Sequence, residues 1–151
     1  MDDELETLSV LEATLRSSGY ELLTADRGRK ALEIAAGRPL DLVIADYRMP
    51  EMDGMELLER LKSEYPELPV VMLTAEESIQ LAVKAIKAGA FDYLNKPFNY
   101  HQIQIVAEKA LAAHRQREEL IRLRREHRRS FGYENLVGNS RTMQDVFHRI
   151  E

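Results

Sequence analysis

Short apolar runs alternate with amphipathic helical stretches through the first hundred residues, and this alternation is the strongest constraint on the fold. Strands separated by helices of about ten residues are joined by right-handed crossovers, which make the strands parallel. Helices then cover both faces of the sheet. The sequence therefore predicts an α/β fold, a doubly wound parallel sheet whose ligand site lies at the carboxyl ends of the strands.

The expected elements are separated by clear turn signals. Leu5, Leu8, Leu11 and Leu15 have the spacing of one helix face, and Ser17-Ser18-Gly19 ends that helix. The other expected helices are residues 31–36, 54–64 and 79–86, and the expected strands are residues 20–25, 40–45, 70–73 and 91–94. A sheet of this kind opens with an apolar strand, whereas this sequence starts on acidic residues. We therefore expect a truncated first strand.

From Asn99 onward the pattern predicts one long, extended helix. Its apolar stripe consists of Ile103, Val106, Ala107, Ala110 and Leu111, and it weakens into an arginine-rich stretch over residues 115–129. Such charge runs usually form a solvated helix face, and no aromatic residues are interleaved there to stack on bases. We expect this helix to be a linker that holds a homodimer through the apolar stripe, together with the face of the 79–86 helix.

Composition excludes several classes of protein. The 151 residues carry a formal net charge of −5, and no apolar run approaches the roughly 20 residues that a membrane span needs. Without cysteine there is no disulfide framework and no thiolate metal site. The acidic start is the opposite of the basic flank of a secretory signal, so we expect a cytoplasmic protein with no membrane partner. The four histidines share no metal-ligand spacing and are expected at the surface.

Groups suited to phosphoryl chemistry follow the ends of three expected strands: Asp46, Thr74 and Lys96. Asp2 and Asp3 would reach the same edge if a strand preceded them. Gathered carboxylates repel one another unless a cation is present, and hard oxygen ligands suit Mg²⁺. A bound Mg²⁺, a lysine and a hydroxyl are what an incoming phosphoryl group requires. Asp46 is therefore the predicted nucleophile, and its product is an acyl phosphate.

Five segments, in this order, resemble the receiver domain of bacterial two-component response regulators: Asp2-Asp3-Glu4, the Asp46 loop ending Met49-Pro50-Glu51-Met52-Asp53-Gly54, Thr74-Ala75, residues 85–90, and Tyr93-Leu94-Asn95-Lys96-Pro97-Phe98. The resemblance covers residues 1–112. It implies a flavodoxin-like sheet of strand order 2-1-3-4-5. It also implies that Asp46 accepts a phosphoryl group from a sensor histidine kinase.

The same resemblance implies roles for the other strand-end residues. Asp3, Asp46 and the backbone carbonyl of Arg48 would bind Mg²⁺, with Asp2 acting through water. Thr74 and Lys96 would contact the phosphoryl oxygens, and Tyr93 would change rotamer together with Thr74. The Lys96–Pro97 peptide bond would be cis.

Residues 131–151, with Asn135-Leu136-Val137-Gly138-Asn139-Ser140 and Met143, are similar to the opening of the AAA+ domain of σ54-dependent, nitrogen-regulation-type transcription activators. The resemblance implies a receiver domain over 1–112, a helical linker over 113–130 and the incomplete start of an AAA+ domain over 131–151. The sequence contains no G-x-x-x-x-G-K-[ST] phosphate loop, so we expect no ATPase activity. σ54 RNA polymerase and DNA would be contacted only through domains absent from this chain.

Two functions are alternatives to a phosphorylation-controlled switch. A haloacid-type phosphatase or phosphotransferase also uses an aspartyl nucleophile, but it has a second carboxylate two residues later, where this chain has Arg48. An enzyme with external substrates is therefore not expected. A phosphorylation-independent dimerisation or interaction module stays open as the alternative.

Arg48 and Glu76 stand two residues after Asp46 and Thr74. We expect their side chains to meet across the mouth of the site, where the pair would hinder the water that attacks an acyl phosphate.

Overall fold

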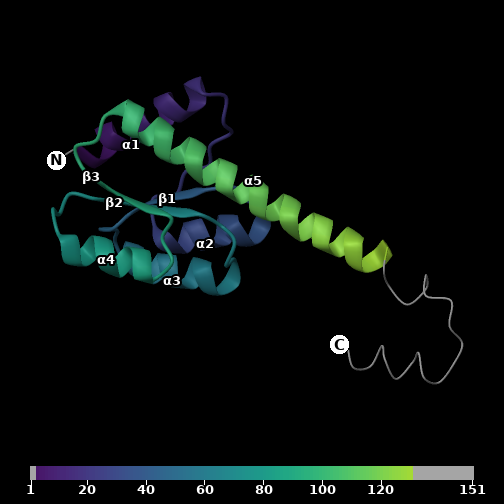
Figure 1. Cartoon of the computed structure of the whole chain (residues 1–151). Coiled ribbons are helices and arrows are strands. Elements are labelled where there is room, and N and C mark those ends of the chain that lie inside the picture. Colours follow the sequence, from purple (N-terminus) through teal and green to yellow (C-terminus); the bar gives the residue numbers. More distant parts are fainter. Residues whose placement is uncertain (1–2, 131–151) are drawn as a thin grey trace, which may run out of the picture. The chain divides into compact units, whose positions relative to one another are not determined.

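The computed structural model describes residues 3–130, with side chains from residue 6 onward (Figure 1). Within this range the elements, in chain order, are α1 (Asp3–Ser17), α2 (Gly28–Gly37), β1 (Val43–Asp46), α3 (Gly54–Glu64), β2 (Val70–Thr74), α4 (Ile79–Lys87), β3 (Asp92–Asn95) and α5 (Tyr100–Ser130). The chain divides into two compact units after His114, inside α5. The expected AAA+ start over 131–151 lies outside the described residues.

The three strands form a parallel sheet in the order β1-β2-β3. They are the strands expected over 40–45, 70–73 and 91–94, and their order agrees with the last three positions of the expected sheet. Asp46 pairs with Leu73, and Thr74 pairs with Asn95. Because the strands are parallel, their carboxyl ends lie at one edge of the sheet.

The strand expected over residues 20–25 is wrong: this segment carries no strand in the structure. A strand exists only through hydrogen bonds to a neighbour, and the expected order places the first strand between this segment and β1. No segment within residues 3–130 occupies that position. Tyr20 and Leu22 still pack against the core. The apolar pattern of this segment therefore indicates contact with the core, although the segment pairs with no strand.

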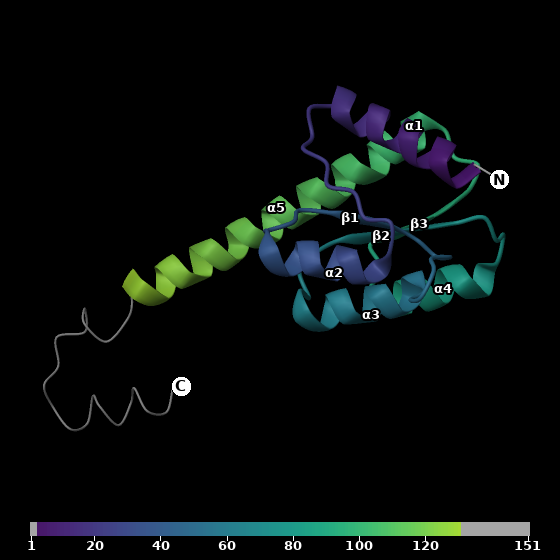
Figure 2. The same ribbon diagram turned by 180° about the vertical axis from the view of Figure 1, so that it is seen from behind.

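Helices cover both faces of the sheet: α2, α3 and α4 lie on one side, and α1 and the first part of α5 lie on the other (Figures 1 and 2). Val70 and Met72 of β2 face the first side, where they pack against α3 and its buried Leu57 and Leu58. Leu73 faces the other side and packs against Ile103 of α5. The alternation along β2 therefore places its side chains in both cores.

The apolar stripe of α5 packs within its own chain. Ile103, Val106, Ala107 and Ala110 are all buried, which leaves little of this stripe for a second copy of the chain. The expectation that the stripe holds a dimer is therefore corrected. None of the helices within residues 3–130 combines the length and the apolar character needed to cross a membrane.

His114 corrects a second expectation, because its side chain is only 8% exposed. Its Nδ1 lies 3.1 Å from the carbonyl oxygen of Glu67, and its Nε2 lies 3.8 Å from Asp41 Oδ1. These partners precede β2 and β1, so this contact lies at the edge of the sheet opposite Asp46. His101 and His127 are exposed as expected.

Candidate functional site

Three residues at or next to strand ends lie at the carboxyl edge of the sheet. Asp46 is the last residue of β1, Thr74 is the last residue of β2, and Lys96 directly follows β3. Lys96 Nζ contacts Asp46 Oδ2, and the two side chains are 18% and 24% exposed. The backbone N–H of Lys96 also donates to the Thr74 carbonyl at 2.7 Å. The structure therefore brings together the three strand-end groups that the sequence singles out.

The loop between β1 and α3 fixes the position of Asp46. Asp53 caps α3 by accepting a hydrogen bond from the Glu56 N–H at 2.8 Å, and the Gly54 N–H donates to the Tyr47 carbonyl at 2.8 Å. A Cβ at position 54 would lie 2.4 Å from the Asp46 carbonyl oxygen. Only glycine permits this approach, so residue 54 determines how closely α3 begins beside the end of β1.

Two donors already hold the Asp46 carboxylate. The Arg48 N–H donates to Oδ1 at 3.1 Å, while Lys96 contacts Oδ2. Each carboxylate oxygen has a second lone pair, so the group retains acceptor capacity for a cation. Of the other expected Mg²⁺ ligands, Asp2 and the side chain of Asp3 lie outside the described part of the chain. The oxygen ligands available there, the Asp46 carboxylate and the Arg48 carbonyl, have the chemistry that Mg²⁺ prefers.

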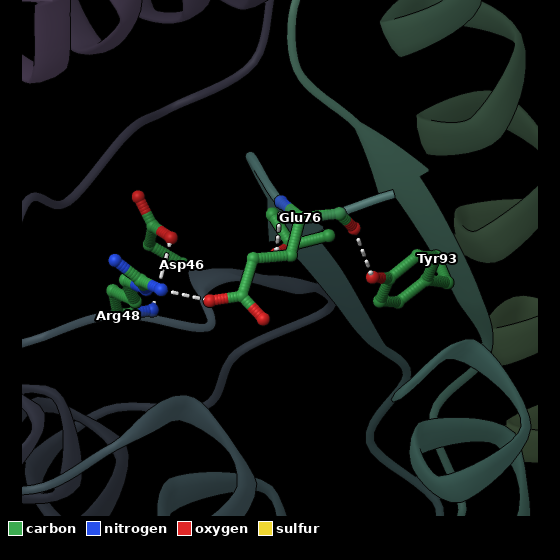
Figure 3. Close-up of polar contacts among 5 residues, drawn as sticks. Asp46, Arg48, Glu76 and Tyr93 are labelled. Carbon is green, nitrogen blue, oxygen red and sulfur yellow. Dashed lines mark hydrogen bonds and ion pairs between the residues drawn. The ribbon is translucent and has the colours of Figure 1, made fainter. Parts of the chain in front are cut away.

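The expected contact between Arg48 and Glu76 is present. The Arg48 guanidinium forms an ion pair with Glu76 Oε1, and the two side chains are 72% and 38% exposed (Figure 3). The pair joins the loop after β1 to the loop after β2, and both of its side chains are more exposed than that of Asp46.

Glu76 also contacts the two residues expected to act as a switch. Its backbone N–H donates to Thr74 Oγ1 at 3.0 Å, and its carbonyl accepts a hydrogen bond from the Tyr93 hydroxyl at 3.2 Å (Figure 3). No sequence pattern predicts the Tyr93 contact, because its acceptor is a backbone carbonyl, which every residue type carries. Thr74 is buried and Tyr93 is half-buried. The Lys96–Pro97 peptide bond is cis, the geometry that the resemblance implies.

Comparison with known proteins agrees with the resemblance to receiver domains. Residues 1–108 match the response regulator receiver domain family. The transcriptional regulatory protein ZraR of Escherichia coli O157:H7 is 45% identical over 112 residues, which are 74% of this chain and 25% of ZraR. The chain thus spans about a quarter of this relative.

Solved structures agree in fold. NtrX from Brucella abortus, in complex with ADP, superposes with a TM-score of 0.75 at 33% identity over 99% of this chain and 32% of that chain. The beryllofluoride-activated NtrC4 receiver domain dimer has a TM-score of 0.71 at 32% identity over 75% of this chain and 93% of that chain. With its strand-end aspartate, threonine and lysine on a parallel flavodoxin-like sheet, the chain belongs to the response regulator receiver domain family.

Proposed function

We propose that Asp46 accepts a phosphoryl group from a sensor histidine kinase and that the chain acts as a switch, without turning over external substrates. The observation that carries this proposal is the contact between Lys96 and Asp46 at the carboxyl edge of the sheet, beside Thr74. An Asp46 carboxylate oxygen attacks the phosphorus, the bond from phosphorus to the kinase histidine nitrogen breaks, and the imidazole leaves and takes up a proton. Asp46 then carries an acyl phosphate.

Mg²⁺ is the cofactor of this proposal. The Asp46 carboxylate and the Arg48 carbonyl would hold it, together with Asp3 directly and Asp2 through water. When bound, the ion supplies positive charge to the transferring phosphoryl oxygens. The oxygen-only ligand set supports this assignment.

Lys96 and Thr74 contact the phosphoryl oxygens in this proposal. The Lys96 ammonium, which pairs with Asp46 before phosphorylation, donates to a phosphoryl oxygen afterwards. The Thr74 hydroxyl donates to another phosphoryl oxygen. Because Thr74 Oγ1 also accepts a hydrogen bond from the Glu76 N–H, movement of the hydroxyl shifts the Glu76 backbone as well. Because the Tyr93 hydroxyl bonds to Glu76, this movement reaches the Tyr93 ring and changes its rotamer. The phosphoryl group thus alters the surface around α4, β3 and α5.

The domain assignment remains as the sequence predicts: a receiver domain over 1–112, a helical linker over 113–130 and the start of an AAA+ domain over 131–151. We propose that the receiver controls a downstream AAA+ transcription activator in the cytoplasm. The match of NtrX over nearly the whole of this chain supports this arrangement. σ54 RNA polymerase and DNA would be contacted by other domains.

A homodimer is part of the proposal, and the NtrC4 receiver domain dimer supports it. Ile79, Val83 and Ile86 lie on one side of α4, and all three are exposed, with Ile79 at 81%. This α4 face replaces the buried α5 stripe as the expected contact. The alternative, a phosphorylation-independent interaction module, would use the same face without a covalent change.

The test is intact-mass analysis after incubation with acetyl phosphate and MgCl₂. The switch predicts an adduct of about 80 Da that Asp46→Asn abolishes. Asp53→Asn is the matched control, because asparagine also caps a helix and should leave labelling intact. An unlabelled wild-type chain would instead support the interaction module.

A further inference from the structure

The turn in the middle of the loop between β1 and α3 packs against the first residue of α2. Met52, in this turn, is 9% exposed and lies close to Gly28. A Cβ at position 28 would lie 2.9 Å from Met52 Sδ and 3.3 Å from Met52 Cβ. The Sδ atom could turn away, but the Cβ atom is bonded to the backbone of the turn. Any side chain at position 28 would therefore push the turn away from α2.

The backbone of Gly28 does not itself require glycine. The residue lies within α2 and outside the left-handed region, in a conformation that alanine adopts more readily than glycine. The close approach of Met52 therefore accounts for glycine at this position.

Glu51, the residue before Met52, is also held by the start of α2. Its φ of +70° is left-handed, a conformation that is uncommon outside glycine and persists where surrounding contacts impose it. The Glu51 carboxylate lies 3.6 Å from the guanidinium of Arg27, which immediately precedes α2. Both side chains are exposed, so this ion pair is weak. The buried contact between Gly28 and Met52 is therefore the stronger of the two.

The turn lies beside a peptide group of the candidate site. Arg48 donates its N–H to Asp46 Oδ1 at 3.1 Å, and its carbonyl is a proposed Mg²⁺ ligand. Two residues later the turn begins, and it is closed by the Met52 N–H, which donates to the Pro50 carbonyl at 2.8 Å. A turn this tight moves as a unit, so displacing Met52 also displaces the Arg48 peptide group.

We propose that Gly28 is a positioning residue for the Mg²⁺ site, because it admits Met52 against α2 and so fixes the direction of the Arg48 carbonyl. The inference rests on the Mg²⁺ site of the proposed function. A Cβ at position 28 requires Met52 to move by a few tenths of an ångström. Contacts that orient metal ligands typically change metal affinity by about 10- to 100-fold, and this small, indirect displacement should cost about three- to tenfold.

Two single variants disturb the contact from opposite sides. Gly28→Ala adds the Cβ at the start of α2, and Met52→Ala removes the side chain that packs there. Gly37→Ala is the matched control, because it makes the same substitution at the other end of α2, where a Cβ meets nothing within 4 Å. Thermal melts check that each variant is folded.

Titration calorimetry of each full chain with MgCl₂, without a phosphodonor, measures the affinity for Mg²⁺ directly. Gly28→Ala and Met52→Ala should each raise the Kd for Mg²⁺ about three- to tenfold, whereas Gly37→Ala should not change it. The double variant of Gly28→Ala and Met52→Ala should bind no more weakly than the weaker single variant, because both substitutions disturb one contact.

Labelling by acetyl phosphate separates positioning from a general loss of structure. At saturating MgCl₂ the labelling rate of Gly28→Ala should stay within about twofold of wild type, because only the affinity for Mg²⁺ changes. A lower rate at saturating MgCl₂ with an unchanged Kd would assign the contact a purely structural role and overturn the inference.

Unchanged Kd values in both single variants, or fold-changes that multiply in the double variant, would also overturn the inference while leaving the proposed phosphorylation of Asp46 intact. A wild-type chain that binds Mg²⁺ but takes no label would overturn the proposed phosphorylation, and the Kd values of the variants would still decide the inference. A wild-type chain that binds no Mg²⁺ would overturn the inference itself.

Discussion

Lys96 and Asp46, fifty residues apart in the chain, form an ion pair whose side chains are both less than one quarter exposed. Replacing one of the two residues leaves the other charge partly buried and without its ion-pair partner. The resulting loss in the free energy of unfolding is larger than the stabilisation that the intact pair provides. The two residues should therefore be coupled in stability as well as in chemistry.

Lys96→Ala should lower the free energy of unfolding by about 1 to 2 kcal/mol, because the Asp46 carboxylate loses its cation. In an Asp46→Asn background the same substitution should cost less, because no charge is left uncompensated. Urea denaturation of the four proteins of this cycle measures the coupling. Equal costs in the two backgrounds would show that the pair contributes nothing.

Lys96→Ala should also retain some labelling by acetyl phosphate while losing the conformational response, because the variant lacks the ammonium that would bind the negatively charged phosphoryl group. Amide hydrogen exchange over residues 74–78, with and without acetyl phosphate, reports that response. A variant whose exchange changes on labelling as much as that of wild type would assign Lys96 a purely structural role.

Gly54→Ala should destabilise the fold by about 1 to 3 kcal/mol and reduce labelling, because a Cβ would lie 2.4 Å from the Asp46 carbonyl oxygen and 2.8 Å from Tyr47 Cα. The loop must shift to relieve these contacts, and Asp46 shifts with it. Gly37→Ala is the control, because its Cβ would meet nothing within 4 Å. Thermal melts and labelling yield check both effects; a Gly54→Ala protein as stable as Gly37→Ala would contradict the close approach.

Tyr93→Phe should lower the free energy of unfolding by about 1 kcal/mol, since the Glu76 carbonyl loses its side-chain donor. Labelling of Asp46 should persist, but amide exchange over residues 74–78 should become faster in the unlabelled protein. Tyr100→Phe, which alters an exposed tyrosine at the start of α5, should change neither property. If the two variants behave alike, the hydrogen bond to Glu76 has no effect on the loop.

Ile79→Ser combined with Val83→Ser should weaken self-association of the phosphorylated chain, since these exposed side chains lie together on α4. Light scattering at tens of micromolar, with and without acetyl phosphate and Mg²⁺, measures the mass. Val10→Ser, an exposed apolar residue on α1, is the control. A wild-type chain that stays monomeric under both conditions would refute the dimer.

The sequence predicts the elements whose signals are local. Helical spacing and the Gly54 start define α3, and the alternation of strands and helices predicts a parallel sheet that gathers Asp46, Thr74 and Lys96 at one edge. The strand predicted over residues 20–25 is wrong, because a strand forms only beside a neighbouring strand. The local sequence pattern contains no information on that neighbour.

Two details of the side chains also lie beyond local patterns. His114 is buried only because α5 brings it onto the segments before β1 and β2, a contact that spans 47 residues to Glu67. The acceptor of the Tyr93 hydroxyl is a backbone carbonyl, which every residue type carries. Tertiary packing decides both, and neither has a characteristic spacing in the sequence.

Glu76 makes its contacts with Thr74 and Tyr93 through its backbone and its contact with Arg48 through its side chain. Every amino acid except proline provides the two backbone groups, whereas few provide a carboxylate. Mutation at this codon therefore acts on the ion pair and spares the connection to Tyr93. Evolution can therefore vary the charge at position 76 without altering the backbone contacts that join Thr74 to Tyr93.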